Sequence, residues 1–219
     1  MKPPVPRFLV ITDTVLQTRY THAELARQAI EGGADGIQFR QKEGSGRELY
    51  RAALETHRVC QEEEVPLIVN DRLDIAMAVD AEGVHLGQED LPAEVARRLW
   101  GLERLIGVSA HTVPQGQSAL HAGADYIGFG PVYATGSKPD ARPPTGVEAL
   151  RRFCQRVPLP VLAIGGVRAE HVSELLDAGA YGVAVISAVC CAEDVVAAAR
   201  QFVEAFRACG VLLGSPRSG

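Results

Sequence analysis

Two carboxylates follow two short apolar segments of the chain, at the points where strands of a sheet would end. Asn70 and Asp71 come directly after residues 67–69, and Asp90 closes the turn that follows residues 84–86. The intervening segment is mostly apolar and lacks glycine and proline, which predicts a buried helix. The resulting βαβ unit should bring Asp71 and Asp90 to the same edge of the sheet. There they suit a Mg²⁺ ion shared with a substrate phosphate; the alternative is that each acid caps the helix that follows it.

Cationic side chains occur after another predicted strand and favour a diphosphate ligand. Gln38, Arg40 and Lys42 alternate along the end of the segment 36–39 and the loop beyond it, so they should form one row. A permanently charged guanidinium beside an ammonium group suits a diphosphate. The alternative for this row is a solvated strand exit without a ligand.

Glycine and serine follow the last two predicted strands, where barrels often bind phosphate. Gly165 and Gly166 come after residues 161–164, and Ser187 comes after residues 182–186. Glycines let backbone N–H groups approach phosphate oxygens, and the segment after Ser187 offers a helix N-terminus. The alternative is that the two glycines only form a turn.

The segment 130–145 is longer than the usual connection between a strand and a helix. Thr135, Ser137 and Lys138 give it two hydroxyls and a cation, which suits contact with a phosphate. Its length and its four prolines predict a lid that orders when ligands bind, whereas the alternative is a flexible insertion without function.

Histidine and cysteine provide no recognisable metal or nucleophile motif. Only His85 and His111 lie near predicted strand ends, and His111 is expected to have a positioning or structural role rather than to act as a base. The five cysteines are odd in number and include no C-x-x-C pair, which argues against a zinc site or a disulfide framework and favours reduced thiols in a cytoplasm.

Composition excludes several classes of partner. The net charge of −5 and the absence of a basic run argue against nucleic acid or a membrane surface as a partner. No apolar segment approaches the ~20 residues that a membrane span requires, and residues 1–12 lack a signal-peptide layout. We therefore expect a cytoplasmic protein that acts on small molecules.

The elements that must position these side chains alternate regularly along the chain. A repeated step of small, acidic and glycine residues enters every second strand, at 33–37, 80–84, 123–127 and, with tyrosine in place of the acid, 179–183. Eight strands and eight helices without a break in composition predict an α/β fold, a single (β/α)8 TIM barrel. An open doubly wound sheet is disfavoured because no G-x-G-x-x-G turn follows the first strand.

We expect one domain over residues 1–219, with a core at 8–209 and a disordered tail at 210–219. The predicted strands are 8–12, 36–39, 67–69, 84–86, 105–108, 126–129, 161–164 and 182–186, and the predicted helices are 21–32, 47–64, 72–80, 92–100, 114–122, 146–157, 169–178 and 193–209.

Seven segments between residues 38 and 187 together resemble the thiamine-phosphate synthase family, and the resemblance extends over about residues 8–206. They are, in order, QFRQK, VNDRLDIA, GVHLGQED, GVSAHT, ADYIGFGPVYATGSK, AIGGV and GVAVIS. The resemblance implies a barrel enzyme that joins hydroxymethylpyrimidine diphosphate to thiazole phosphate, releases diphosphate and depends on Mg²⁺. The reaction would be a dissociative substitution, since the aminopyrimidine can delocalise positive charge on its methylene carbon.

The resemblance also implies a role for individual residues. The catalytic set would be Arg40, Lys42, Lys138 and Ser109, and Ser137 stands where many members of the family have threonine. The implied contacts are Arg40, Lys42, Asn70, Asp71 and Lys138 with diphosphate, Asp71 and Asp90 with Mg²⁺, Gln38 and Ser109 with the pyrimidine, and Thr135, Ser137, Gly166, Ile186 and Ser187 with thiazole phosphate.

Two other functions fit the same sequence. A thiazole tautomerase of the same family would need the thiazole-phosphate half of the site and a proton shuttle, for which His111 is available, but no diphosphate clamp. A non-catalytic barrel that binds phosphorylated metabolites would bind both ligands without turnover. Retention of Arg40, Lys42, Asp71 and Asp90 together favours the synthase.

Overall fold

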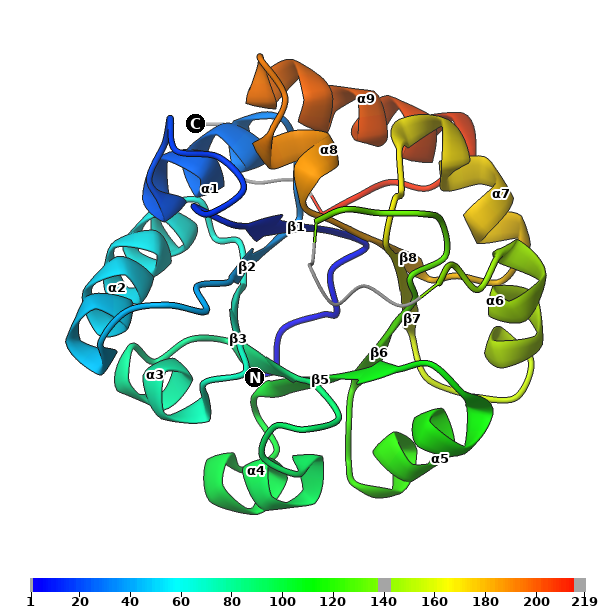
Figure 1. Ribbon diagram of the computed structural model, residues 1–219, viewed down its shortest axis with the longest axis horizontal. Coiled ribbons are helices and arrows are strands. Elements are labelled where there is room, and N and C mark those ends of the chain that lie inside the picture. Colours follow the sequence, from blue (N-terminus) through cyan, green and yellow to red (C-terminus); the bar gives the residue numbers. More distant parts are fainter. Residues whose placement is uncertain (1, 138–142, 215–219) are drawn as a thin grey trace.

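The computed structural model describes residues 2–137 and 143–214, in which eight parallel strands close into a barrel surrounded by helices (Figure 1). Each strand pairs with its neighbours in sequence, and β8 pairs with β1. The predicted TIM barrel is therefore confirmed. The strands are β1 Phe8–Thr12, β2 Gly36–Phe39, β3 Leu67–Asn70, β4 Gly83–Leu86, β5 Leu105–Ala110, β6 Tyr126–Phe129, β7 Val161–Ile164 and β8 Gly182–Val185.

The helices follow the predicted order with local differences. The predicted helix 72–80 is shorter because Asp71 and Asp80 both take a left-handed backbone conformation, with φ values of 63° and 59°. The segment after Ser187 forms a short additional helix, and the seventh helix begins with a 3-10 turn, η1. The helices are α1 His22–Glu31, α2 Gly46–Glu62, α3 Leu73–Ala78, α4 Ala93–Trp100, α5 Val113–His121, α6 Val147–Cys154, η1 Ala169–His171, α7 Val172–Asp177, α8 Ser187–Cys190 and α9 Val195–Ala208.

Alternation along the strands builds two separate apolar cores. In β1, Phe8 and Val10 belong to the outer core between sheet and helices, whereas Leu9 and Ile11 belong to the core inside the barrel. Strands buried on both faces read as continuous apolar runs, which explains the sequence FLVIT. The inner core consists of Leu9, Ile11, Ile68, Tyr126, Leu162, Ala184 and Ile186.

The repeated acidic residue that precedes alternate strands has a structural explanation. Asp35, Glu82 and Asp125 each accept a hydrogen bond from a backbone N–H at the start of the preceding strand, at Phe8, Leu67 and Ile106 respectively. Each carboxylate therefore joins two neighbouring strands at the amino-terminal end of the barrel. The repeat stabilises the fold at the end opposite to the predicted site.

The N-terminal segment crosses this end of the barrel (Figure 1). Lys2 pairs with Asp125 at 2.7 Å, the backbone oxygen of Val5 accepts a hydrogen bond from the Tyr181 hydroxyl, and the Arg7 guanidinium lies 4.1 Å from the centre of the Tyr181 ring. Val5 also packs against the inner core. These contacts close the end of the barrel that faces away from the predicted chemistry.

We expect Asp125→Ala to lower the free energy of unfolding by about 3 kcal/mol, because it removes the counter-charge of the partly buried Arg97 guanidinium and leaves the Ile106 N–H without its hydrogen-bond partner. Asp125 accepts hydrogen bonds from Arg97 at 2.6 Å and from the Ile106 backbone at 2.8 Å. Urea denaturation measures the change. Lys2→Ala, which removes only the more exposed partner, is the control and should cost less than about 1 kcal/mol. Equal losses in the two variants would contradict this account.

Two predicted features are described only in part. The segment 130–145 includes residues 138–142, and the tail 210–219 includes residues 215–219, which lie outside the described residues. The prediction of a lid therefore falls in part on residues that the structure does not describe. Among the described residues, no helix has the length and apolar character required to cross a membrane.

Candidate active site

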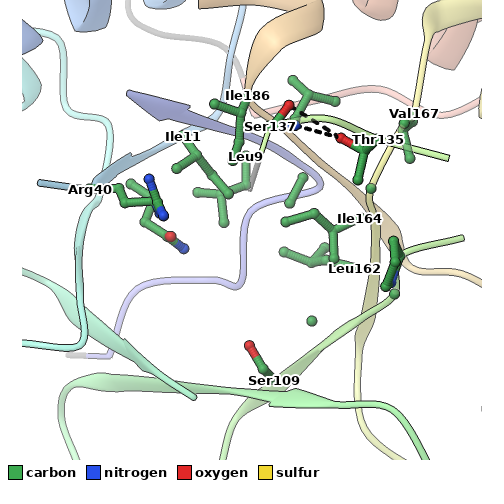
Figure 2. Close-up of a pocket in the computed structure, with 18 of the residues that line it drawn as sticks. Leu9, Ile11, Arg40, Ser109, Thr135, Ser137, Leu162, Ile164, Val167 and Ile186 are labelled. Atoms are coloured by element: carbon green, nitrogen blue, oxygen red, sulfur yellow. Dashed lines mark hydrogen bonds between the residues drawn. The ribbon is translucent and has the colours of Figure 1, made fainter. Parts of the chain in front are cut away.

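A cavity of about 840 Å³ opens at the carboxyl ends of the strands. Its walls include every predicted site residue that the structure describes, whereas Lys138 lies outside the described residues. Figure 2 shows Arg40, Ser109 and the pair Thr135 and Ser137 at separate positions around an apolar centre. The predicted residues in the walls are Gln38, Arg40, Lys42, Asn70, Asp71, Asp90, Ser109, Thr135, Ser137, Gly166, Ile186 and Ser187.

Arg40 is held in place by a buried acid at the end of β1. The Asp13 side chain is almost completely buried and pairs with the Arg40 guanidinium, while its other oxygen accepts hydrogen bonds from the N–H groups of Val15 and Leu16. The Nε atom of Arg40 is buried without a hydrogen-bond partner among the described residues. Asp13 thus supports the site through Arg40, a role that the sequence analysis did not assign to it.

Lys42, Asp71 and Asp90 form a charged group beyond the carboxyl ends of β2, β3 and β4. The Lys42 ammonium pairs with Asp71, and Asp90 accepts a hydrogen bond from the Gly87 N–H at 2.7 Å. Burial raises the pKa of Asp90, and the neighbouring Asp71 carboxylate raises this pKa further. The expected meeting of the two acids at one edge of the sheet is therefore observed.

The alternative that these acids cap helices is wrong. The N-cap residue of α3 is Arg72 and that of α4 is Pro92, and neither residue makes a side-chain capping hydrogen bond. Asp71 instead takes a left-handed conformation and donates its backbone N–H to the oxygen of His85 at 2.8 Å. Its carboxylate is left to face Lys42 and the cavity.

The donor set around Asp71 and Asp90 fits Mg²⁺. Two carboxylates that repel one another would both be stabilised by a divalent cation between them. Among the described residues, no group of three or more His, Cys, Asp and Glu side chains is able to hold a metal. The remaining ligands would be water and substrate oxygens, which is how Mg²⁺ is commonly bound in enzymes that act on phosphates.

Hydroxyl groups from the loop after β6 and from α8 meet on the other side of the cavity. Thr135 donates to the Ser137 oxygen at 3.2 Å, and Ser137 donates to the oxygen of Ser187 at 2.9 Å. Gly166 lies against this loop, and a Cβ at this position would overlap the oxygen of Ala134. The loop and the strand end thus form a second polar group in the wall of the cavity.

Ser109 lies at the floor of the cavity in contact with His85. The Ser109 Oγ is 2.9 Å from His85 Nε2, and the Ser109 backbone oxygen accepts a hydrogen bond from Gln88 at 2.6 Å. Alternation in β4 directs His85 inward, since Val84 and Leu86 belong to the outer core. This periodicity was the available signal for His85, which the sequence analysis did not assign to the site.

His111 has the structural contacts expected of a positioning residue. Its Nδ1 is 2.6 Å from the backbone oxygen of Gly130, and its backbone N–H donates to Gln115 at 2.9 Å. It therefore anchors the start of the long loop after β6.

Comparisons with known proteins relate nearly the whole chain to one group of enzymes. The sequence model of the thiamine monophosphate synthase family matches residues 8–189. The thiamine-phosphate synthase of Methanocella arvoryzae is 53% identical over 191 residues, which cover 87% of this chain and 90% of that protein. The thiamine-phosphate synthase of Chloroflexus aurantiacus is 48% identical over 195 residues, or 89% of this chain and 90% of that protein. Among solved structures, thiamine phosphate pyrophosphorylase from Pyrococcus furiosus superposes with a TM-score of 0.84 at 40% identity, covering 92% of this chain and 96% of that chain.

Proposed function

We infer that this chain, which belongs to the thiamine monophosphate synthase family, is a thiamine-phosphate synthase. It transfers the hydroxymethylpyrimidine group from its diphosphate to thiazole phosphate and releases diphosphate. The observation that carries this inference is the division of one cavity into a cation-and-carboxylate half and a hydroxyl half. Two phosphorylated substrates that react with each other require two such sites on opposite sides of a common centre.

The diphosphate would occupy the half of the cavity formed by the ends of β2, β3 and β4. Arg40 and Lys42 provide fixed positive charge, and Asn70 provides an amide at the same edge. Lys138 is proposed as a third cation. When Mg²⁺ is bound by Asp71 and Asp90, it stabilises negative charge on the leaving diphosphate. The pairing of Arg40 with Asp13 keeps the guanidinium in position before substrate arrives.

The acceptor substrate would occupy the other half. The hydroxyls of Thr135, Ser137 and Ser187 and the backbone at Gly166 are proposed to bind the thiazole phosphate, and Ile186 to contact its ring. Gln38 and Ser109 also line the cavity and are proposed to hold the pyrimidine. Gln38 is almost completely buried.

The bond changes require no protein nucleophile. The C–O bond to diphosphate breaks, both electrons leave with the diphosphate oxygen, and the aminopyrimidine ring delocalises the positive charge on the methylene carbon. The thiazole nitrogen then donates its lone pair to that carbon. Leu9, Ile11 and Leu162 form an apolar centre of the cavity (Figure 2), which limits capture of the cation by water.

The thiazole tautomerase remains the main alternative function. It requires only the hydroxyl half of the cavity and a proton shuttle. The close grouping of Lys42, Asp71 and Asp90 favours the synthase, because a tautomerase gains nothing from it. A non-catalytic binding protein differs from both in showing no turnover.

Incubation with both substrates and Mg²⁺, followed by chromatographic detection of thiamine phosphate, tests the proposal. We expect product only when both substrates and the metal are present, together with one equivalent of diphosphate. Isomerisation of the thiazole without coupling would identify a tautomerase. Binding of both ligands without any product would identify a non-catalytic protein.

We further propose that residues 1–219 form a single domain and that the protein is cytoplasmic. Every described strand belongs to one closed barrel, which supports the first proposal. All five cysteines are free, as is usual for proteins of a reducing compartment, which supports the second.

A further inference from the structure

A polar chain runs through the apolar interior of the barrel beneath Ser109. The Tyr126 hydroxyl lies 3.0 Å from His85 Nδ1, and His85 Nε2 lies 2.9 Å from the Ser109 Oγ. The three residues come from β6, β4 and β5, three adjacent strands. Tyr126 is completely buried and His85 is nearly so, while Ser109 faces the cavity (Figure 2).

Two glycines make room for this chain. A Cβ at position 107 would overlap the Tyr126 ring and lie 2.5 Å from His85 Nδ1, and a Cβ at position 128 would lie 3.0 Å from His85 Cε1. The neighbours of the chain in the inner core are aliphatic, such as Ile68 and Leu162. An unpartnered polar group in such surroundings is destabilising. The side chains of Tyr126 and His85 therefore depend on each other for their hydrogen bonds and form one network.

The direction of the hydrogen bonds follows from the chemistry of the two rings. Among the described residues, His85 Nδ1 is the hydrogen-bond partner of the Tyr126 hydroxyl, and the surrounding core is aliphatic, so we assign the hydroxyl as the donor and Nδ1 as the acceptor. The ring proton is then on Nε2, which donates to the Ser109 oxygen. This arrangement leaves the proton of the Ser109 hydroxyl directed at the cavity.

We propose that His85 is a positioning residue that fixes the Ser109 hydroxyl as a hydrogen-bond donor to a ring nitrogen of the pyrimidine. The proposal rests on the proposed function, in which Ser109 contacts that ring. The hydrogen bond from Tyr126 to Nδ1 leaves the ring proton of His85 on Nε2. Ser109 must then accept at its oxygen from Nε2, and its own proton is free to be donated. A serine without the imidazole behind it would rotate and either donate or accept.

Two substitutions at His85 separate its two contacts. The amide nitrogen of Gln reaches the position of the imidazole Nε2, so His85→Gln retains a donor to Ser109, whereas Asn reaches only the position of Nδ1. We expect His85→Asn to lower kcat/KM for the pyrimidine diphosphate by about ten- to a hundredfold. His85→Gln should stay within about threefold of the wild type, and KM for thiazole phosphate should change by less than about twofold in either variant.

A double-mutant cycle with Ser109→Ala distinguishes positioning from packing. If His85 acts through Ser109, His85→Asn should cause no further loss beyond about twofold in the Ser109→Ala background. Losses that multiply would show that His85 has only a packing role and would overturn the inference. If His85→Asn fails to fold, Tyr126→Phe removes one hydroxyl and should lower the same kcat/KM by about fivefold, again only when Ser109 is present.

The outcomes separate this inference from the proposed function. A wild-type protein that makes no thiamine phosphate would refute the proposed function, and the inference would fall with it. An active wild type whose kcat/KM is unaffected by Ser109→Ala would refute the assigned contact of Ser109. An active wild type that is sensitive to Ser109→Ala but indifferent to His85→Asn would refute the role of His85 alone.

Discussion

Asp71→Asn should lower turnover at least about 100-fold. Mutation of a residue that only hydrogen-bonds to a metal ligand typically lowers activity or metal affinity by about 10–100-fold, and loss of the ligand itself should have a larger effect. The substitution keeps the size of the side chain and removes the charge that would bind Mg²⁺. Asn also tolerates the left-handed conformation of this position, where φ is 63°, so the fold should be preserved. Steady-state rates over a Mg²⁺ titration, with thermal unfolding as a check on folding, measure the effect.

The control for this prediction is Asp74→Asn, a neighbouring acid on α3. Asp74 pairs with Arg72 at the surface and is absent from the walls of the cavity, so this variant should retain wild-type activity. Full activity of Asp71→Asn in excess EDTA would refute the metal assignment. A large loss in both variants would point to a disturbed helix instead of a lost ligand.

Lys42→Ala and Ser187→Ala should impair opposite halves of the site. Removing one charge-assisted contact costs roughly 1.5–3 kcal/mol, so Lys42→Ala should weaken the binding of Mg²⁺–diphosphate by about ten- to a hundredfold. It should leave thiazole phosphate nearly unaffected, because that ligand would bind across the cavity beside Ser187 and Ser137. Ser187→Ala should show the reverse pattern. Calorimetry with the two ligands on the three proteins measures both effects.

A charge-conserving control sharpens this comparison. Lys42→Arg keeps the positive charge beside Asp71 and should retain more diphosphate affinity than Lys42→Ala, and diphosphate binding by the wild type should weaken as salt increases. A wild type that does not bind diphosphate in the presence of Mg²⁺ would rule out the synthase and favour the tautomerase. Equal losses for both ligands in Lys42→Ala would contradict two separate sites.

The order of residues in the chain predicts the barrel architecture and most of the residues that line the cavity. Strand ends in a parallel barrel all lie on one rim, so the order of strands suffices to gather the residues that follow them. Asp71, Ser109 and Ser187 are far apart in the chain and nevertheless line one cavity. The helix 72–80 was predicted too long because local periodicity does not reveal that Asp71 and Asp80 leave the right-handed region.

Which side chains meet is settled only when the barrel closes. Asp13 with Arg40, Ser137 with Ser187, and His85 with Ser109 each join different elements, and their contacts depend on the register and tilt of the strands. Periodicity indicates that a side chain points inward but not which neighbour it finds there. These partners fix the orientation of charges and hydroxyls in the cavity, because hydrogen bonds require a separation near 3 Å that only the closed barrel imposes.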